Sequence, residues 1–261
     1  MSSVNMQELL EKLERKPGSH KGENGRVAVI AGSVDYTGAP AIASRAALRT
    51  GCDLVKLLVP EAISDVVASY SENFIVESYQ GNYFGSQTLE AAEEFAEWSD
   101  ALVVGPGLGQ PEEEALQQLL SGVEVPAVVD ADAIGPGCLV EPGNLVFTPH
   151  SSEAEEIEEE RGSLSEFAEK GAVILQKGPV DQVYSGEKYR NRTGTPAMTV
   201  GGTGDALSGV VASLLSRGLN RTDAARLGAW INGRAGELAA DEYGNGMLAT
   251  DLVERIPDAI R

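Results

Sequence analysis

The chain has 261 residues, and 42% of them are hydrophobic, which is enough for a substantial core. Its 40 acidic and 20 basic residues give a formal charge of −20, which argues against nucleic acid and anionic membranes as partners. No apolar run approaches the roughly 20 residues of a membrane-spanning helix, and the polar start shows no signal-peptide core. We therefore expect a cytoplasmic protein, and we interpret its acidic surface as the mark of a salt-loving organism.

From its start, the chain predicts a short helix over 6–13 and then a regular alternation of apolar and amphipathic segments. The apolar, β-branched runs predict buried strands at 26–32, 53–60, 101–105, 126–132, 144–149 and 172–178. The amphipathic stretches predict helices at 39–49, 61–70, 86–98, 112–120 and 151–170. This rhythm is typical of βαβ units and predicts an α/β fold with a mainly parallel central sheet covered by helices on both faces.

The pattern changes beyond the last of these strands. The segment 181–192 predicts a β-hairpin, and an apolar stripe after Gly204 predicts a helix that ends at Gly218. Two further helices are predicted at 224–242 and 250–260. No long linker, low-complexity stretch or internal repeat is visible in the sequence, so we expect a single domain over residues 1–261.

The segment VGGTGDALSG (200–209) places three glycines before an aspartate that opens a helix. Glycine lets the backbone approach a ligand closely, and the free N–H groups of a helix N-terminus bind anions. The alternative interpretation is a tight turn in which Asp205 merely interacts with the helix dipole. A single turn would need only one or two glycines, so the cluster favours a phosphate site.

Other glycine-rich turns directly follow predicted strands, at 31–40 and 104–109, and Thr-Pro-His (148–150) also stands at a strand end. Ligands of open parallel sheets bind in the crevice beyond the carboxyl ends of the strands, so these turns are expected to share one cleft. The sequence contains no GxxxxGK[ST] string and no full GxGxxG motif after a strand, so this is neither a P-loop nor a typical dinucleotide turn.

Individual side chains at these strand ends are candidates for chemistry, each with a structural alternative. His150 is either a residue that begins a helix or a ligand contact. Lys177 is either a point charge that reaches a phosphate or a solvated surface lysine. Asp130 and Asp132 either serve a magnesium–phosphate centre or accept hydrogen bonds within their own turn.

In order along the chain, the strings SHKGENG, VAVIAGSVDYTGAP, VVGPGLG, VVDADAI, FTPHSSE, QKG and GGTGDALSG resemble the ADP/ATP-dependent NAD(P)H-hydrate dehydratases. The resemblance spans nearly the whole chain and implies a ribokinase-like fold. It also implies repair of hydrated NADH and NADPH with Mg²⁺ and ADP or ATP: the nucleotide phosphorylates the added hydroxyl, and phosphate then leaves. Prokaryote-like members generally use ADP, so we expect ADP. The epimerase domain that is often fused N-terminally is expected to be absent.

The family's functional positions can be carried over residue by residue. The positions that contact the hydrated cofactor correspond to Ala39, Gly107, His150 and Asp205, and Asp205 stands at the position of the catalytic aspartate. The positions that hold the nucleotide correspond to Lys177, Gly178, Pro179, Val180, Asp181, Gly202, Thr203 and Gly204. The metal ligands are not identified by the resemblance. An aspartate at a helix start is expected to have a lowered pKa and to stay ionised, ready to accept the proton of the attacking hydroxyl.

Three positions depart from the family pattern. Ser151 and Ser152 follow the histidine where Pro-Gly is usual, Asp181 stands where threonine is common, and Asn232 stands where histidine is frequent. These positions bear on nucleotide choice and affinity more than on reaction type. The alternatives to a dehydratase are a small-molecule kinase of the same superfamily, acting on a vitamin precursor or sugar, and a non-catalytic nucleotide-binding sensor. We expect a homo-oligomer in each case.

Overall fold

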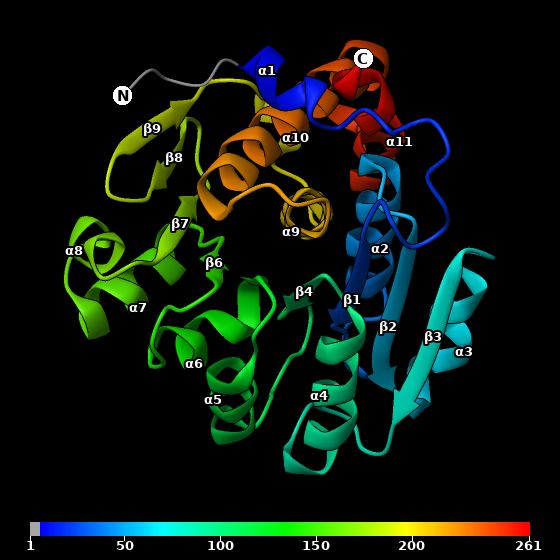
Figure 1. The fold of residues 1–261 in the computed structure, drawn as a ribbon, viewed down its shortest axis with the longest axis vertical. Coiled ribbons are helices and arrows are strands. Elements are labelled where there is room, and N and C mark those ends of the chain that lie inside the picture. Colours follow the sequence, from blue (N-terminus) through cyan, green and yellow to red (C-terminus); the bar gives the residue numbers. More distant parts are fainter. Residues whose placement is uncertain (1–5) are drawn as a thin grey trace.

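The computed structural model describes residues 6–261, except for the side chain of Cys138, and these residues form one nine-stranded sheet (Figure 1). The strands are β1 (Arg26–Ile30), β2 (Leu54–Pro60), β3 (Phe74–Tyr79), β4 (Ala101–Val104), β5 (Ala127–Val129), β6 (Leu145–Phe147), β7 (Val173–Gln176), β8 (Asp181–Tyr184) and β9 (Lys188–Asn191). Their order across the sheet is β3-β2-β1-β4-β5-β6-β7-β8-β9. All pairs from β3 to β7 are parallel, and the β8–β9 hairpin adds two antiparallel pairs.

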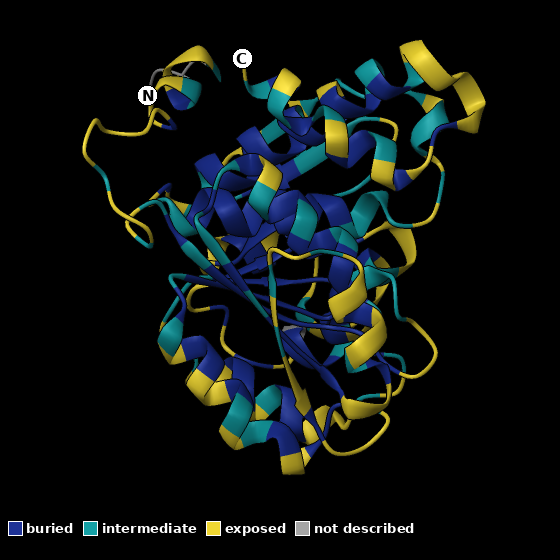
Figure 2. Ribbon diagram, turned by 90° about the vertical axis from the view of Figure 1, so that its right-hand side faces the viewer, coloured by how far each residue is buried: buried dark blue, intermediate teal, exposed yellow. Residues whose placement is uncertain are grey.

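Helices cover both faces of the sheet (Figure 2), which confirms the α/β architecture expected from the sequence. One core is built with α1 (Met6–Glu11), α2 (Ala39–Thr50), α3 (Glu61–Ser69), α9 (Thr203–Ser216), α10 (Arg221–Tyr243) and α11 (Ala249–Ile260). The opposite core is built with α4 (Leu89–Trp98), α5 (Glu113–Gly122), α6 (Ile134–Cys138), α7 (Ser151–Arg161) and α8 (Leu164–Glu169). Short 3₁₀ turns are η1 (Ser86–Thr88), η2 (Ala131–Ala133), η3 (Pro196–Met198) and η4 (Gly244–Gly246).

Alternate residues of the central strands enter opposite cores. In β1, Val27 and Val29 pack in the core of α2 and α9, whereas Ala28 and Ile30 pack in the core of α4 and α5. All four side chains are fully buried. Because successive side chains of a strand point to opposite faces, a strand covered on both faces must be apolar throughout. This is the physical reason why the central strands are continuous apolar runs in the sequence.

Three elements depart from the sequence prediction. Strand β3 was not predicted, because it lies at the sheet edge and is half exposed, with Ile75 40% exposed, so it lacks the continuous apolar run of the central strands. The single helix predicted over 151–170 is wrong. The chain leaves α7 at Gly162, whose φ is 81°, and Ser163 starts α8 through a capping box with Glu166. The short helix α6 was also not predicted.

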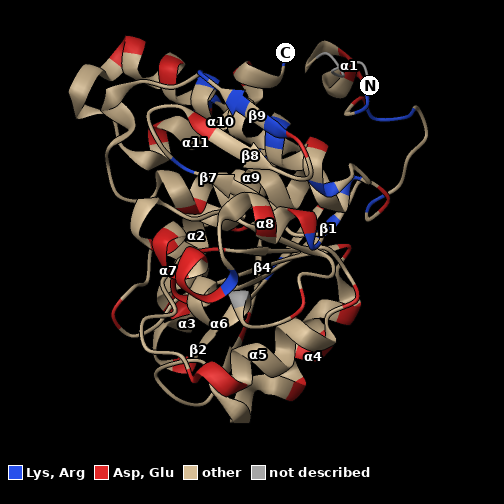
Figure 3. Cartoon of the chain, turned by 90° about the vertical axis from the view of Figure 1, so that its left-hand side faces the viewer, with Lys and Arg blue, Asp and Glu red and all other residues tan. Residues whose placement is uncertain are grey.

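Charge is distributed unevenly over the fold (Figure 3). Acidic residues are frequent along helix α7, whereas lysine and arginine residues gather near β9 and α10. Lys188 and Arg190 are exposed on β9, the edge strand, where charged side chains discourage pairing with another sheet. Within the described residues, no helix combines the length and hydropathy needed to span a membrane.

Candidate active site

The loops that follow β1 and β4 to β7 meet at the carboxyl edge of the sheet, as expected for parallel neighbours. Backbone hydrogen bonds tie these loops side by side. The Gly32 N–H donates to the Pro106 carbonyl at 2.9 Å, and the Lys177 N–H donates to the Pro149 carbonyl at 2.8 Å. Helix α9 joins them through Ser208 in its second turn, which donates to Asp130. The turns singled out in the sequence therefore lie along one edge of the molecule.

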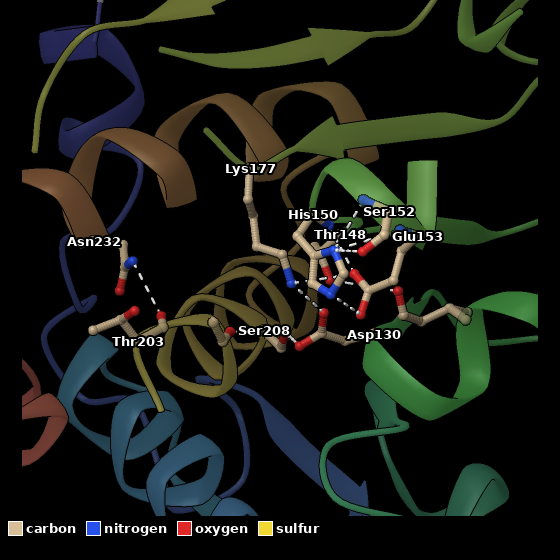
Figure 4. A network of polar contacts seen from close by, with 11 residues as sticks. Asp130, Thr148, His150, Ser152, Glu153, Lys177, Thr203, Ser208 and Asn232 are labelled. Atoms are coloured by element: carbon tan, nitrogen blue, oxygen red, sulfur yellow. Dashed lines mark hydrogen bonds and ion pairs between the residues drawn. The ribbon is translucent and has the colours of Figure 1, made fainter. Parts of the chain in front are cut away.

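Asp130 is the most enclosed acidic group of this edge (Figure 4). Its residue is 1% exposed, and both carboxylate oxygens are occupied. Oδ1 accepts a hydrogen bond from Lys177 Nζ at 2.8 Å, and Oδ2 accepts one from Ser208 Oγ at 2.6 Å. The side chain therefore does not cap its own turn, and it reaches two distant elements instead.

Lys177 is not a solvated surface lysine, because its side chain is only 20% exposed. The ammonium is 2.8 Å from Asp130 and 3.9 Å from Glu153. A Cβ added to Gly204 would lie 3.4 Å from Nζ, so the positive charge stands beside the first turn of α9. Burial acts to lower the pKa of Lys177, but Asp130 and Glu153 outweigh it and raise the pKa. The lysine is therefore charged and fixed at the point where an anion would meet the helix.

The glycines before α9 have different structural roles. Gly202 precedes the helix with φ 99°, and a Cβ there would lie 2.7 Å from Ile42 Cδ1, so the fold itself requires glycine. A Cβ on Gly201 would meet nothing within 4 Å, and Gly204 has no left-handed backbone. Packing and backbone conformation thus account for Gly202 but not for Gly201. The hydroxyl of Thr203 donates to the carbonyls of 198 and 200 and so closes the turn.

The expectation of a lowered pKa for Asp205 is wrong. Burial raises the pKa of this carboxyl to about 6, the negative charge of Asp130 adds to the rise, and Lys177 only partly opposes it. The N-terminus of a helix favours an anion, but here the loss of water and a neighbouring carboxylate dominate. A carboxylate with a pKa of about 6 is better matched to proton transfer near neutral pH than an ordinary aspartate.

His150 starts α7, as its structural interpretation predicts, and it does so in a specific way. Its Nδ1 accepts from the N–H groups of Ser152 at 3.2 Å and Glu153 at 3.4 Å, and Glu153 Oε2 accepts from the His150 N–H at 2.7 Å. Glu153 Oε1 lies 3.1 Å from His150 Nε2, and burial raises the pKa of Glu153. The imidazole is half exposed beside Lys177, so capping the helix leaves it accessible to a ligand as well.

Ala39 and Gly107 come together on the other side of this edge. Gly107 has φ 65°, and a Cβ there would lie 3.0 Å from Ala39 Cβ and 2.8 Å from Tyr36 Cβ. The loop after β4 can therefore approach the start of α2 only with glycine at this position. Nearby, Asp132 accepts from the Gly109 N–H at 2.8 Å, and the partial loss of water around its carboxyl, together with the charge of Asp130, raises its pKa.

The turn after Lys177 is organised by Asp181. Its Oδ1 accepts from the Gly178 N–H at 3.0 Å, and its Oδ2 accepts from Asn191 Nδ2 at 3.0 Å. Asn191 also donates to the Ala229 carbonyl at 3.1 Å, which links the turn to α10. Within this turn Pro179 is exposed and Val180 is half-buried. The family's threonine position is thus filled here by a carboxylate that stabilises the loop.

A second departure, Asn232, lies on α10 against the start of α9. Its Nδ2 donates to the Thr203 carbonyl at 3.3 Å, and its residue is 6% exposed. The structure therefore brings Lys177 and the glycine turn 202–204 close to Asp205, with Ala39 at the start of α2 and Gly107 on the loop after β4 packed against each other. It places Asp130, Ser208 and Glu153 among them, and the sequence assigned no such role to the last two. Two local signals existed: Ser208 follows Gly204 by one helical turn, and Glu153 follows His150 at capping-box spacing.

The described residues form no cluster of three or more His, Cys, Asp or Glu side chains that could hold a metal ion. Asp130 has both oxygens engaged by protein donors, and Asp132 already accepts one backbone N–H. The protein groups alone therefore do not fit a resident Mg²⁺. A Mg²⁺ ion that travels with nucleotide phosphates needs few protein ligands, because it keeps several waters.

Residues 27–258 match the family model of the NAD(P)H-hydrate dehydratases. The ADP-dependent (S)-NAD(P)H-hydrate dehydratase of Haloterrigena turkmenica is 47% identical, over 92% of this chain and 94% of the relative. The chain belongs to the NAD(P)H-hydrate dehydratase family. The corresponding enzyme of Natrialba magadii is 49% identical over 92% of this chain and 93% of the relative. The bifunctional NAD(P)H-hydrate repair enzyme of Methanothermobacter thermautotrophicus is 41% identical, over 97% of this chain but 53% of the relative.

Solved structures with this fold confirm the ribokinase-like architecture expected for the family. A ribokinase-like superfamily protein from Enterococcus faecalis has a TM-score of 0.84 at 22% identity and covers 98% of this chain and 94% of that one. The ADP/ATP-dependent NAD(P)H-hydrate dehydratase of Bacillus subtilis, co-crystallised with ATP and Mg²⁺, has a TM-score of 0.79 at 24% identity, covering 98% of this chain and 96% of that one.

Proposed function

We propose that this protein catalyses the ADP-dependent dehydration of hydrated NADH and NADPH and so restores NAD(P)H. The observation that carries the proposal is Asp205, a carboxyl with a pKa of about 6 at the start of α9, next to the ammonium of Lys177. Family membership supports the substrate, and the relatives with 47% and 49% identity are named as ADP-dependent enzymes. Turnover with ATP instead of ADP is the alternative nucleotide choice.

The chemistry assigned to each group follows from its position. Asp205 is ionised above about pH 6 and accepts the proton of the substrate hydroxyl as that oxygen attacks the terminal phosphorus of ADP. AMP leaves, and its negative charge is stabilised by Lys177 and by the N–H groups at the start of α9. Phosphate then leaves the ring carbon with the electron pair of the C–O bond, and loss of a proton from the adjacent carbon restores the dihydronicotinamide. Phosphate is a better leaving group than hydroxide, which is why the nucleotide is consumed.

The proposal extends to the binding residues. Lys177, Gly178, Pro179, Val180, Asp181, Gly202, Thr203 and Gly204 would hold the nucleotide, while Ala39, Gly107, His150 and Asp205 would contact the hydrated cofactor. Mg²⁺ bound to the nucleotide would supply neutralisation of the phosphate charge. The cytoplasmic location, the homo-oligomeric state and the salt-loving origin stay predictions from the sequence.

The test is incubation of the purified protein with hydrated NADH or NADPH, Mg²⁺ and either ADP or ATP, following recovery of dihydronicotinamide absorbance. We expect recovery with the nucleotide present and stoichiometric release of AMP and phosphate from ADP. A panel of vitamin-precursor and sugar alcohols is tested in parallel. Phosphorylation of one of these alcohols without dehydration of either hydrated cofactor would identify a kinase, and binding of nucleotide with no turnover of any substrate would identify a sensor.

A further inference from the structure

We propose that Asp130 is a positioning residue for nucleotide binding, which acts by holding the ammonium of Lys177 against the first turn of α9. The inference rests on the proposed function only in taking ADP as the nucleotide. Asp130 follows β5, Lys177 follows β7, and Ser208 lies on α9, so one carboxylate connects three separate elements of the site (Figure 4). Neither the family resemblance nor the chemistry assigned above uses this residue.

The two contacts of Asp130 differ in what they fix. Oδ1 accepts from Lys177 Nζ at 2.8 Å, and Oδ2 accepts from Ser208 Oγ at 2.6 Å. Ser208 also donates to the Gly204 carbonyl at 3.2 Å, so the carboxylate is attached to the same helical turn that carries Gly204 and Asp205. A charge-assisted hydrogen bond is directional and stronger than a neutral one, which makes this carboxylate an effective clamp.

Lys177 needs such a clamp because a competing partner is within reach. Glu153 Oε2 is 3.9 Å from Nζ, compared with 2.8 Å for Asp130. The lysine side chain has four rotatable carbon–carbon bonds, so without Asp130 the ammonium would be shared between Glu153 and Asp205, and its position would no longer be set by one short contact. The short contact to Asp130 thus keeps the charge where a Cβ on Gly204 would be 3.4 Å away, at the helix N-terminus.

The surroundings of Asp130 also explain why the group that holds Lys177 is a carboxylate and why water does not compete for it. Asp130 is 1% exposed, so water does not compete for its oxygens, and each oxygen has one protein donor. A buried ion pair is worth little to stability by itself but is costly to break from one side, which suits a positioning role. An uncharged residue at position 130 would leave Lys177 charged, but the ammonium would no longer be held in one position by a charge-assisted hydrogen bond.

A double-mutant cycle tests this coupling through the Kd of ADP, measured by calorimetry on wild type, Asp130→Asn, Lys177→Met and the double variant. We expect a Kd increase of about thirtyfold for Lys177→Met and about tenfold for Asp130→Asn, the scale of one charge-assisted contact. The double variant should bind no more weakly than Lys177→Met, because Asp130 acts only through the lysine. In steady-state assays Asp130→Asn should raise the KM for ADP more than it lowers kcat.

The proposal is overturned if Asp130→Asn leaves the Kd of ADP unchanged, or if the effects of the two single substitutions add up in the double variant. A lower Kd in Asp130→Asn would also overturn it, because it would show that the Asp130 carboxylate merely repels phosphate. Absence of ADP binding by wild type also overturns it. Asp53→Asn is the matched control, because Asp53 is likewise buried and paired with a cation, Arg15, at 2.9 Å on the opposite edge of the sheet. It should lower stability without changing the Kd of ADP.

If Asp130→Asn does not fold, Asp130→Glu takes its place, since it keeps the charge but shifts the carboxylate by one methylene. Its Kd for ADP should then rise at least threefold, and an unchanged Kd would overturn the proposal. Calorimetry needs no hydrated cofactor, so the outcome is separable from the proposed function. Coupled ADP binding without any dehydration would refute the dehydratase assignment and leave the role of Asp130 intact.

Discussion

The helices on the two faces of the sheet differ in how closely they approach and in the charge they carry. A Cβ on Gly209 of α9 would lie 2.0 Å from the Ala43 carbonyl oxygen of α2, and one on Gly228 of α10 would lie 2.6 Å from Val211 of α9. On the other face, a Cβ on Gly137 of α6 would lie 2.8 Å from Val129 Cγ1, a side chain rather than a backbone atom, whereas Gly122 of α5 is exposed and a Cβ there would meet nothing within 4 Å. Helix α7 on that face has six glutamates, whereas α2 has no acidic residue.

The difference in packing and charge indicates that the two faces have different roles. Where α2, α9 and α10 meet through glycine and small residues, the position of α9 is determined by backbone contact rather than by adaptable side chains. The first turn of α9 carries Asp205, so the face with the closest packing also holds the chemistry. Most glutamates of α7 are exposed to water and salt, although the start of the same helix carries His150 and Glu153 of the site.

The largest effect is expected from Asp205→Asn, which removes the base and leaves the packing of both faces intact. Turnover should fall by roughly two to four orders of magnitude, the usual contribution of one general base, while ADP still binds. The measurement is kcat with hydrated NADH, combined with calorimetry of ADP. Retention of more than about a tenth of wild-type kcat would remove Asp205 from the mechanism.

The same carboxyl predicts the acidic limb of the pH profile. Because its pKa is raised to about 6 in the free protein, the basic form is lost as pH falls through that value, and kcat/KM should decline about tenfold for each further pH unit. An aspartate with an ordinary pKa would keep full activity down to about pH 5. Activity that stays constant between pH 7 and pH 5, on a protein shown to remain folded, would contradict the raised pKa.

Gly209→Ala should have the largest effect on stability, because the added Cβ overlaps the Ala43 carbonyl of the packed backbone. We expect the free energy of unfolding to fall by about 3 kcal/mol. Gly122→Ala, at an exposed position of α5, is the control for adding a methyl group to a helical glycine, and open space with helix propensity should make this change neutral or stabilising by up to about 1 kcal/mol. Equal losses in urea unfolding would show that the overlap with Ala43 is not the cause.

Gly204→Val tests the approach of phosphate to α9. Its Cβ would stand 3.4 Å from Lys177 Nζ, and the branched side chain would occupy space beside the helix N–H groups. ADP affinity should drop about tenfold, the equivalent of one good contact. Gly122→Val, on the other face, should leave affinity unchanged. An unaltered Kd in a folded Gly204→Val protein would mean that phosphate binds elsewhere.

The smallest effect concerns the acidic face. Its carboxylates repel one another most at low salt, and the screening length shrinks from about 10 Å at 0.1 M to about 3 Å at 1 M. The Tm should therefore rise by several degrees between about 0.1 M and 2 M KCl, mostly below about 1 M. Because salt also strengthens apolar burial, the control is a variant with several α7 glutamates changed to glutamine, at positions 155, 156, 158, 159 and 160. If its Tm climbs as steeply, the charge explanation and the salt-loving origin lose their support.

The sequence by itself determined the features that depend on local chemistry. The central strands can be predicted because a strand buried on both faces is apolar throughout. The edge strand β3 was not predicted because it is half exposed and has no continuous apolar run. The glycine-rich start of α9 and the order of motifs along the chain sufficed to predict the fold and the family. The break between α7 and α8 was also encoded locally, as Gly162 followed by the Ser163–Glu166 capping box, although the prediction overlooked it.

Only the tertiary structure decided the electrostatics of the site. Asp130 meets Lys177 and Ser208 across 47 and 78 residues of sequence, so neither partner could be inferred from the turn in which it stands. Folding also reverses the expectation for Asp205. A helix start taken alone lowers the pKa of an aspartate, whereas burial beside Asp130 raises the pKa of Asp205 to about 6. A pKa depends on the water removed and on the charges brought near, and folding determines both.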